Sequence, residues 1–217
     1  MLTRSYYVAI EGIDGAGTTT HTNLLVSNLR KLGYCSFSIE EPSRGPIGVV
    51  IRELLKKGPF SQKILTLLFA SDRLHQWYNI EKMKAEENCV IVGDRSFISS
   101  LVYQSYEDFP DAVPLEWVYE VNRYTLRPDM VIILDVDPAH ALERLSRGRG
   151  QREKPEKYKY LVGLSRRYLY VAKILSRLLP VVIVREYDNN GKELSIDTVA
   201  RRVLVATLAL VKYIEKR

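Results

Sequence analysis

Residues 12–20 carry the strongest chemical signal in the sequence, because glycines and hydroxyl side chains there directly follow an apolar run. The segment has three glycines within six positions and reads Gly12-Ile13-Asp14-Gly15-Ala16-Gly17-Thr18-Thr19-Thr20. Glycines let backbone N–H groups converge on an anion, and the N-terminus of a following helix adds the positive end of its dipole. The segment therefore predicts a cradle for phosphate groups to which all of these residues contribute.

The spacing matches the phosphate-binding pattern G-x-x-x-x-G-K-[ST], with one departure. Gly12 and Gly17 are spaced correctly, and Thr19 occupies the hydroxyl position that binds magnesium. Thr18 stands where the pattern has a lysine, whose charge normally contacts the β- and γ-phosphates. A purely structural glycine turn is the alternative, but the preceding strand, the spacing, Thr19 and Asp14 together favour phosphate binding. The missing positive charge must then come from elsewhere in the chain.

A second chemical group follows residues 89–92, an apolar run that predicts a buried strand. Asp94 and Arg95 lie at its tip, and packing does not explain them because an isolated buried charge is costly. Asp94 is placed to hold a water on magnesium, and Arg95 to grip a phosphate in the planar fork of its guanidinium. Polar and aromatic side chains then open a helix: Ser99, Ser100, Tyr103 and Gln104.

Spacing alone does not establish a function for three other arginines. Phe69 and Arg73 are four residues apart and share one side of a predicted helix, which is typical of a core aromatic beside a solvated arginine. Arg44 lies in a proline-broken loop, residues 40–46, at the carboxyl end of a predicted strand, where open α/β sheets place ligand residues. It is either a solvated charge or a phosphate contact. Arg52 lies on the polar face of the next helix.

Positive charge is concentrated between residues 144 and 177, which contain eleven lysines and arginines and two acidic residues, whereas the whole chain has a net charge of +6. Such a block suggests an anionic partner, namely nucleic acid, a membrane surface or a polyphosphate, and the glycine segment favours a nucleotide. Glycines alternate with Arg149 and other arginines here, Arg152 among them. We therefore predict a mobile basic lid at about residues 147–157, with a solvated linker as the alternative.

The elements that must position these groups alternate between strand and helix. Short apolar runs predict five strands, at residues 6–10, 35–39, 89–92, 130–135 and 181–184. Helical spacing predicts helices from residue 18 to about 32 and over residues 47–55, 61–87, 115–126 and 138–147. A further long helix follows the loop that ends at Pro155 and continues to about residue 179, and the last helix begins at residue 196. The alternation predicts an α/β fold, a five-stranded parallel sheet with helices on both faces. We expect residues 1–217 to form a single domain that carries the lid.

Composition places the chain among globular proteins, since 46% of its 217 residues are hydrophobic. Cys35 and Cys89 each begin an apolar run, which predicts buried free thiols in a cytosolic protein, with a disulfide as the lesser alternative. No signal peptide precedes the first strand, and residues 203–211 are too short an apolar segment to span a bilayer. We therefore expect a cytoplasmic protein with no membrane partner.

Together these motifs resemble the thymidylate kinases, a family of P-loop nucleoside monophosphate kinases, over residues 8–203. The family's opening E-G-x-D-G-x-G-K-[ST]-T is met by residues 11–20 except at Thr18. Residues 40–48 loosely match its R-E-P-G-G-x-P-[LI]-G loop, and residues 67–73 match its L-L-F-x-A-x-R helix. Residues 94–104 match D-R-[YF]-x-x-S-x-x-[AV]-Y-Q, with Ser96 at the aromatic position. Residues 134–144 match L-D-V-x-P-x-x-A-L-x-R, whereas the lid pattern R-G-x-x-D-R-x-E is met only in part.

The resemblance implies the P-loop NTPase fold, ATP with Mg²⁺ as the phosphoryl donor, dTMP as the acceptor, and a homodimer. Residues 12–20 would bind ATP, with Thr19 and Asp94 at the metal. Phe69 would stack on thymine and Arg73 would hydrogen-bond its carbonyl edge, which replaces the interpretation from spacing alone. Tyr103 would lie against the sugar and disfavour a 2′-hydroxyl. The other acceptor-site residues would be Glu41, Pro42, Arg52, Arg95, Ser99, Ser100 and Gln104.

The implied mechanism depends on charge. Both reactants are anions, so their repulsion must be cancelled before in-line attack, and phosphoryl transfer needs positioning and positive charge more than covalent help. Arg95 and magnesium would supply fixed charge, with Asp14 and Asp94 close to the metal and the acceptor. We hypothesise that a lid arginine, Arg149 or Arg152, arrives on closure and partly replaces the missing loop lysine.

Three other functions stay open on the sequence alone. A deoxynucleoside kinase shares a phosphate loop and an acidic-Arg-Ser strand tip, which residues 94–96 also fit, although the segment around Phe69 and Arg73 argues against it. The absence of the lysine is compatible with a nucleotide-binding protein that no longer turns over, although the other site residues are retained. A nucleic-acid binder would use the basic block and bind with a steep salt dependence; we expect no such partner.

Overall fold

The fold is organised around one parallel sheet. The computed structural model describes residues 2, 4–58, 60–84, 88–109, 111–147 and 155–216. Five strands lie in the order β2-β3-β1-β4-β5, and every neighbouring pair is parallel. Their bounds are Tyr6–Gly12 for β1, Ser36–Glu40 for β2, Val90–Asp94 for β3, Met130–Asp135 for β4 and Val181–Arg185 for β5. The predicted fold class is confirmed.

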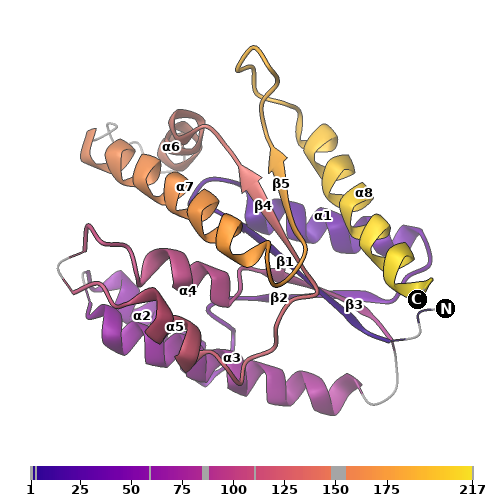
Figure 1. Cartoon of the computed structure of the whole chain (residues 1–217), viewed down its shortest axis with the longest axis horizontal. Coiled ribbons are helices and arrows are strands. Elements are labelled where there is room, and N and C mark those ends of the chain that lie inside the picture. The colour runs from indigo at the N-terminus through magenta and orange to yellow at the C-terminus, as the bar shows by residue number, and fades with distance from the viewer. Residues whose placement is uncertain are drawn as a thin grey trace.

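Helices cover both faces of this sheet (Figure 1). α1 and α8 pack together on one face, and α4 and α7 pack together on the other, beside α3. The bounds are Thr18–Lys31 for α1, Pro46–Lys56 for α2, Gln62–Lys84 for α3, Phe97–Tyr103 for α4, Leu115–Val121 for α5, Pro138–Arg147 for α6, Pro155–Leu175 for α7 and Ile196–Glu215 for α8. In the part of the chain that is described, no helix is long and apolar enough to cross a membrane.

Two helices end earlier than their apolar periodicity predicts. The helix predicted over residues 115–126 stops at Val121, because the side chains that follow bind nearby carbonyls: Asn122 donates to Val118 at 2.8 Å and Thr125 donates to Asn122 at 2.8 Å. α7 ends at Leu175 rather than near residue 179, since residues 176–179 form a turn before Pro180. In both helices the apolar spacing in the sequence therefore continues beyond the last helical hydrogen bond.

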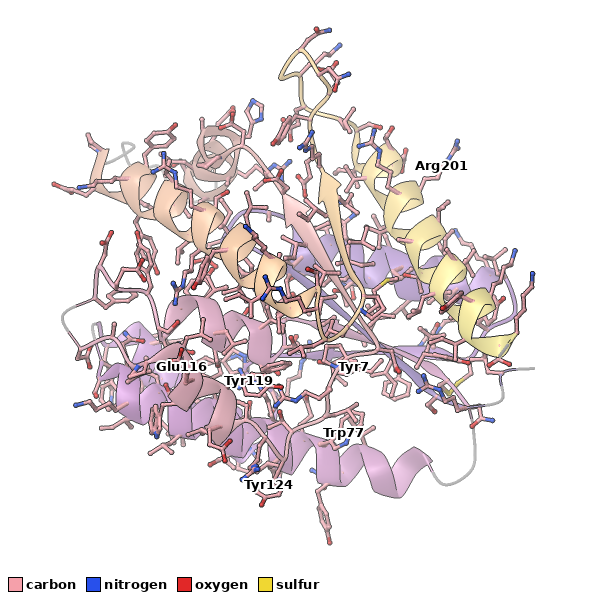
Figure 2. The ribbon with its side chains drawn as sticks, viewed as in Figure 1. Tyr7, Trp77, Glu116, Tyr119, Tyr124 and Arg201 are labelled. Carbon is pink, nitrogen blue, oxygen red and sulfur yellow. A yellow bond between two sulfur atoms is a disulfide. The ribbon has the colours of Figure 1, made fainter. Side chains whose placement is uncertain are left out.

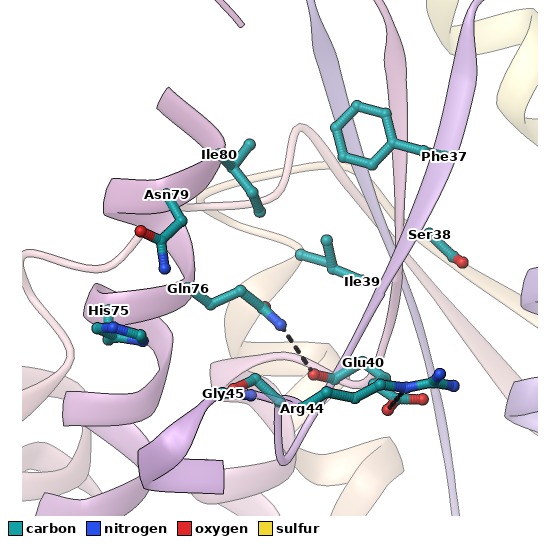
Figure 3. Close-up of a pocket in the computed structure, with 11 residues that line it drawn as sticks. Phe37, Ser38, Ile39, Glu40, Arg44, Gly45, His75, Gln76, Asn79 and Ile80 are labelled. Atoms are coloured by element: carbon teal, nitrogen blue, oxygen red, sulfur yellow. Dashed lines mark hydrogen bonds and ion pairs between the residues drawn. The ribbon is translucent and has the colours of Figure 1, made fainter. Parts of the chain in front are cut away.

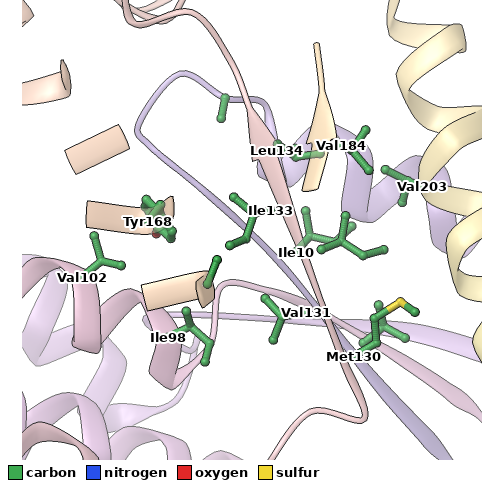
Figure 4. Packing of buried hydrophobic residues seen from close by; sticks show 14 of the residues in the cluster. Ile10, Ile98, Val102, Met130, Val131, Ile133, Leu134, Tyr168, Val184 and Val203 are labelled. Carbon is green, nitrogen blue, oxygen red and sulfur yellow. The ribbon is translucent and has the colours of Figure 1, made fainter. Parts of the chain in front are cut away.

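The core lies on both sides of the central strands. Every residue of β1 and β3 is buried, as is usual where a parallel sheet is covered on both faces. Figure 4 shows Ile10 beside Val184 and Val203 on the side of α1 and α8, with Ile98 and Tyr168 across the sheet. The edge strand β5 is different, because most of its residues are half-buried or exposed.

The prediction of free thiols is wrong, because Cys35 and Cys89 form a disulfide with Cα atoms 4.6 Å apart. Each cysteine immediately precedes a strand, and β2 and β3 are parallel neighbours that begin side by side. The residues lie 54 positions apart in the sequence, so their proximity follows from strand order, which the apolar runs alone do not reveal. The bond lies at the amino ends of the strands.

Candidate active site

The phosphate loop lies where β1 ends and α1 begins, at the carboxyl end of the central strand. Gly15 and Gly17 have positive φ angles of 87° and 78°, a conformation that favours glycine. A Cβ atom on Gly15 would lie 2.5 Å from the carbonyl oxygen of Ala141. Gly17 is the N-cap of α1 and provides no side-chain cap, so the first-turn N–H groups face the loop. Residues 12–20, predicted to bind ATP, thus form one loop and first helical turn.

Arg144 is a fixed cation that supports this loop without replacing the lysine. Thr18 is buried, and its hydroxyl brings no charge to the lysine position. Arg144 of α6 donates to the carbonyl oxygen of Gly15 at 3.0 Å. Its guanidinium also pairs with Glu186 at 2.7 Å and with Glu193 at 2.5 Å. Two carboxylates therefore already neutralise the charge of Arg144.

Thr19 and Asp94 lie together as the predicted metal site requires. The hydroxyl of Thr19 donates to Oδ2 of Asp94 at 2.5 Å, joining the first turn of α1 to the tip of β3. Hydroxyl and carboxylate oxygens are ligands that Mg²⁺ prefers, and Mg²⁺ keeps waters and substrate phosphates as its other ligands. Among the described residues, no group of three or more His, Cys, Asp or Glu gathers to hold a metal. This donor set fits a metal that arrives with a nucleotide.

Arg95 joins the phosphate loop to the helices on the other side of the site. Its φ angle is 77°, a left-handed conformation that costs a residue other than glycine about 1 kcal/mol or more. The guanidinium donates to the carbonyl oxygen of Gly12, to the hydroxyl of Tyr168 at 2.7 Å and to Asp14 at 3.0 Å. The unusual backbone thus aims a half-buried cation across the mouth of the loop.

Glu11 and Tyr168 belong to this network although neither was predicted to be a site residue. Glu11 is completely buried and accepts hydrogen bonds from Ser96 at 2.7 Å, from Ser99 at 2.6 Å and from Tyr168 at 3.1 Å. Burial raises the pKa of Glu11, and the nearby charge of Arg95 opposes that rise. Glu11 is the first letter of the glycine motif, which was a usable signal. Tyr168 lies in the middle of a periodic helix and gave none.

A cavity of about 310 Å³ opens beside Arg95 and Asp14, and we name it the acceptor cavity after the residues predicted to bind the acceptor. Of the residues predicted to bind the acceptor, all except Arg52 line it: Glu41, Pro42, Phe69, Arg73, Arg95, Ser99, Ser100, Tyr103 and Gln104. Leu55 and Tyr160 complete the wall, and neither was predicted. The sequence thus identified most of the lining of one cavity from residues on three separate segments.

Arg73 is buried at the base of the cavity and is held on three sides. Glu41 accepts from its Nη2 at 2.7 Å, Asn122 accepts from Nη1 at 2.6 Å, and Ser100 accepts from Nη2 at 2.7 Å. Its guanidinium lies 5.6 Å from the ring centroid of Phe69. Burial raises the pKa of Glu41, and Arg73 opposes this rise. Arg73 is therefore a fixed donor beside an aromatic face, which is not the solvated arginine that spacing suggests.

Gln104 and Tyr103 line the same cavity from the end of α4. Oε1 of Gln104 is buried and has no hydrogen-bond partner among the residues described. A buried acceptor without a partner is costly, so it is suited to a ligand N–H. The hydroxyl of Tyr103 donates to Asp14 at 3.2 Å, and burial strongly raises the pKa of Tyr103. The ring is thereby held neutral between the cavity and the phosphate loop.

Arg52 does not line the acceptor cavity; instead it supports the loop that does. Its guanidinium donates to the carbonyl oxygens of Pro42 and Ser43 and pairs with Glu40 at 3.1 Å. Spacing predicted a polar helix face but not this inward turn onto the loop. Arg44 is exposed and pairs with Glu40 at 2.8 Å, which agrees with the solvated alternative.

A second cavity lies behind the same loop (Figure 3). It has a volume of about 540 Å³ and is bounded by β2, the loop around Arg44 and the α3 residues His75, Gln76 and Asn79. Gln76 donates to the backbone oxygen of Glu40 at 3.2 Å. This cavity contains none of the residues predicted for catalysis or nucleotide binding, so we do not assign the reaction to it.

The predicted lid arginines, Arg149 and Arg152, lie outside the described residues, as does everything between the end of α6 and the start of α7. α7 brings two aromatic side chains from the far side of this segment to the site. Tyr160 lines the acceptor cavity, and Tyr168 binds Arg95. The helix that follows the predicted lid therefore contacts both Arg95 and the cavity beside it.

Comparisons with known proteins identify the family of the chain. The family model for thymidylate kinase matches residues 10–193. The chain is 44% identical over 170 residues to the probable thymidylate kinase of Methanothermobacter thermautotrophicus, covering 76% of this chain and 80% of that protein. It is 31% identical over 202 residues to the probable thymidylate kinase of Thermococcus gammatolerans, covering 89% and 93% respectively.

The fold also has a solved counterpart. A crystal structure of thymidylate kinase from Ehrlichia chaffeensis superimposes with a TM-score of 0.70 at 20% sequence identity, covering 94% of this chain and 99% of that one. At this identity the likeness concerns the fold alone. The family match, which spans most of the chain and includes the phosphate loop and the acceptor segments, carries the assignment: the chain belongs to the thymidylate kinase family.

Proposed function

We propose that this site transfers the terminal phosphoryl group of ATP to the 5′-phosphate of dTMP, giving ADP and dTDP, with the residues described above in specific roles. The chain is an ATP-dependent nucleoside monophosphate kinase by its family. The observation that supports these roles best is the position of Arg95. This arginine lines the acceptor cavity and also binds Gly12 of the phosphate loop, so one cation contacts both halves of the site.

The acceptor cavity is suited to thymine by its donors and acceptors. Phe69 offers an aromatic face, Arg73 offers fixed N–H donors, and Gln104 offers an acceptor without a partner among the described residues. Thymine presents a carbonyl oxygen next to an N–H, which matches that pair. Cytosine presents an amino group next to an acceptor, which is the reverse. We propose that Tyr103 faces the sugar and disfavours a 2′-hydroxyl.

The proposed mechanism depends on positive charge around the phosphates and on the positions of the two reactants. The acceptor phosphate is itself an oxyanion, so a strong general base is not needed. Arg95 would hold that phosphate, and Asp14 would orient Arg95 through their 3.0 Å contact. Thr19 and Asp94 would hold Mg²⁺, which supplies positive charge to the donor phosphates when bound. We propose that Arg149 and Arg152 complete the site from the lid and supply the charge that Thr18 lacks.

We also propose that the chain acts as a homodimer. Large apolar side chains are exposed along two helices that pack against each other, namely Val49 and Val50 on α2 and Leu67, Leu74 and Tyr78 on α3. Contiguous apolar surface on a globular protein commonly marks an interface.

Formation of ADP from ATP and magnesium tests the reaction, with dTMP, thymidine, dUMP or no acceptor in parallel. We expect turnover that depends on dTMP and exceeds turnover with thymidine, which separates this function from a deoxynucleoside kinase. The same assays on Thr18→Lys test the missing lysine. Turnover in Thr18→Lys but none in the native protein with any acceptor would contradict the proposal and indicate a nucleotide-binding protein without catalysis.

A further inference from the structure

The two edge strands of the sheet differ in how far side chains cover their outward backbone groups: β2 is covered at both ends and β5 at one end. On β2, Cys35 and Glu41 bond toward β3, so Ser36, Ser38 and Glu40 turn their backbone groups outward. Two side chains cover the ends of this edge: Arg30 donates to the oxygen of Ser36 at 2.9 Å, and Gln76 donates to that of Glu40 at 3.2 Å. Between them, the outward N–H and C=O groups of Ser38 have no partner among the described residues. Such cover is a common way to prevent an edge strand from pairing with another chain.

β5, the opposite edge, is left open at its centre. The backbone oxygen of Pro180 accepts from Val131, and the backbone N–H of Glu186 donates to Asp135. The backbone N–H and C=O groups of the even-numbered residues therefore point toward β4, whereas those of Val181, Ile183 and Arg185 point outward. Arg202 donates to the outward oxygen of Arg185 at 3.0 Å. Within the described part of the chain, the outward N–H and C=O groups of Val181 and Ile183 have no partner.

The open edge forms the floor of a groove. A cavity of about 740 Å³ runs along β5, with Leu169 of α7 on one side and Val205 and Ala206 of α8 on the other. α8 packs against β5, whereas α7 lies over β4 and leaves the second face of β5 uncovered (Figure 1). Ile183 and Val205 are 45% and 60% exposed, so the groove presents apolar surface as well as unpaired backbone.

The groove is also strongly positive. Arg185, Arg201 and Arg202 line it, and Arg201 lies on the exposed side of α8 (Figure 2). Asp135 is the one carboxylate in this lining among the described residues, and it is 12% exposed and 3.9 Å from Arg185. The side chain of Arg185 is 66% exposed. The charges gather toward the carboxyl end of the strand.

We propose that this β5 groove binds an extended acidic segment of a partner protein, which adds to the sheet as a sixth strand. Main-chain hydrogen bonds to Val181 and Ile183 hold the segment, and alternate acidic side chains reach the arginines. A second copy of the chain fits poorly. The β5 strand of a second copy has α8 packed against it, and a helix is about 10 Å wide, whereas an added strand lies about 4.8 Å away. It would also bring the same three arginines.

Because recognition rests on backbone and charge, a simple peptide is a sufficient probe. A labelled peptide of about twelve residues that alternates valine with glutamate is titrated into the full-length protein and followed by fluorescence anisotropy. We expect saturable binding that weakens with salt, and hydrogen-exchange protection gained at the amides of Val181 and Ile183. The same peptide with lysine for glutamate should not bind. Equal binding by both peptides, or no protection at these amides, would overturn the proposal.

Two variants separate backbone from side chain at one position. Ile183→Pro removes the outward N–H without touching the bonds to β4, so affinity should fall about tenfold or more. Ile183→Ala keeps that N–H and should lose only about threefold. Arg201→Glu with Arg202→Glu should abolish binding of the glutamate peptide, because the groove would then repel it. Turnover of dTMP in each variant verifies folding, since none of these residues belongs to the proposed catalytic machinery.

The ligand side provides a test that does not depend on the folding of Ile183→Pro. N-methylation of alternate residues on the pairing edge of the peptide removes its donors but keeps its charge and apolar side chains. Only methylation on that edge should weaken binding, by about tenfold. Equal weakening from methylation on either edge would refute strand addition. Self-association of the native protein that disappears in Ile183→Pro would assign the groove to a second copy instead.

Discussion

Arg95 depends on neighbours that hold it across the site. Its left-handed backbone presents the guanidinium to Gly12, Asp14 and Tyr168 together. Tyr168 in turn donates to the buried Glu11, so a carboxylate fixes the hydroxyl that receives the arginine. A cation prepared in this way needs little reorganisation when a phosphate arrives. Arg95 could be predicted as a site residue from its place at the strand tip, whereas its partner Tyr168, in the middle of a periodic helix, could not.

Replacing Tyr168 by Phe tests this positioning. The change removes the hydroxyl that accepts from Arg95 and donates to Glu11. A hydrogen bond to a charged group is commonly worth about 1.5–3 kcal/mol, so we expect kcat/KM for dTMP to fall by about ten- to a hundredfold or more. Steady-state kinetics with dTMP varied is the measurement. Tyr170→Phe, on the exposed side of the same helix, should change nothing. Unchanged kinetics in Tyr168→Phe would mean that Arg95 is held by its other partners.

His21 should make stability depend on pH. It is 4% exposed, and its Nδ1 has no hydrogen-bond partner among the described residues. Burial, assisted by the charge of Arg144, lowers its pKa from 6.5. As pH falls below 6.5, His21 binds a proton in the unfolded chain but stays neutral in the folded chain. The free energy of unfolding therefore decreases.

Urea unfolding measured from about pH 7 to about pH 5 checks this expectation. His21→Gln should flatten the decrease in that window, and His140→Gln provides the control for loss of another histidine. If His21→Gln kept the same slope as the native protein, other groups would be responsible for the pH dependence.

Among the elements, α7 has a double role, because it follows the predicted lid and carries Tyr160 and Tyr168. If a lid arginine replaces the loop lysine, Arg149→Ala or Arg152→Ala should reduce turnover by orders of magnitude, since one transition-state cation is commonly worth about 10³-fold or more. Binding of dTMP, followed by calorimetry, should be nearly unchanged. Normal turnover in both variants would contradict the hypothesis.

The disulfide between the starts of β2 and β3 should matter for stability and not for catalysis. It closes a loop of 54 residues, which in the chain-entropy model stabilises the fold by about 4 kcal/mol. We expect Cys35→Ser with Cys89→Ser to lower the free energy of unfolding by about that amount. The native protein in dithiothreitol should behave like the variant, and turnover at 25 °C should be retained because the site lies at the opposite ends of the strands. Equal free energies of unfolding for the native protein and the double serine variant would show that the disulfide does not stabilise the fold.

At the scale of the whole molecule, the exposed apolar side chains of α2 and α3 predict a dimer. Leu67→Glu places a charge on that surface and should convert the protein to a monomer in analytical ultracentrifugation. Leu178→Glu, at an exposed site outside these helices, should leave the oligomeric state unchanged. A native protein that sediments as a monomer at all concentrations would contradict the dimer.

Much of this molecule could be predicted because its chemistry lies where strands end. Asp94 and Arg95 follow an unbroken apolar strand, and Gly12 follows another, so sequence order alone placed them at one edge of the sheet. The order of the strands could not be predicted from the apolar runs, and the disulfide depends on it. Arg52 and Tyr168 were missed or misplaced because their partners come from distant segments. Periodicity reports which face of a helix is buried and not what that face touches.

The bond between Cys35 and Cys89 also makes part of the chain a closed ring. That ring contains β2, α2 and α3, and with them Glu41, Phe69 and Arg73 of the acceptor cavity. A protease that cuts a single peptide bond inside the ring, for example beside Gly58 in the connection between α2 and α3, leaves the two pieces covalently joined through the disulfide. The nicked protein would migrate as one band without reductant and as two bands with it.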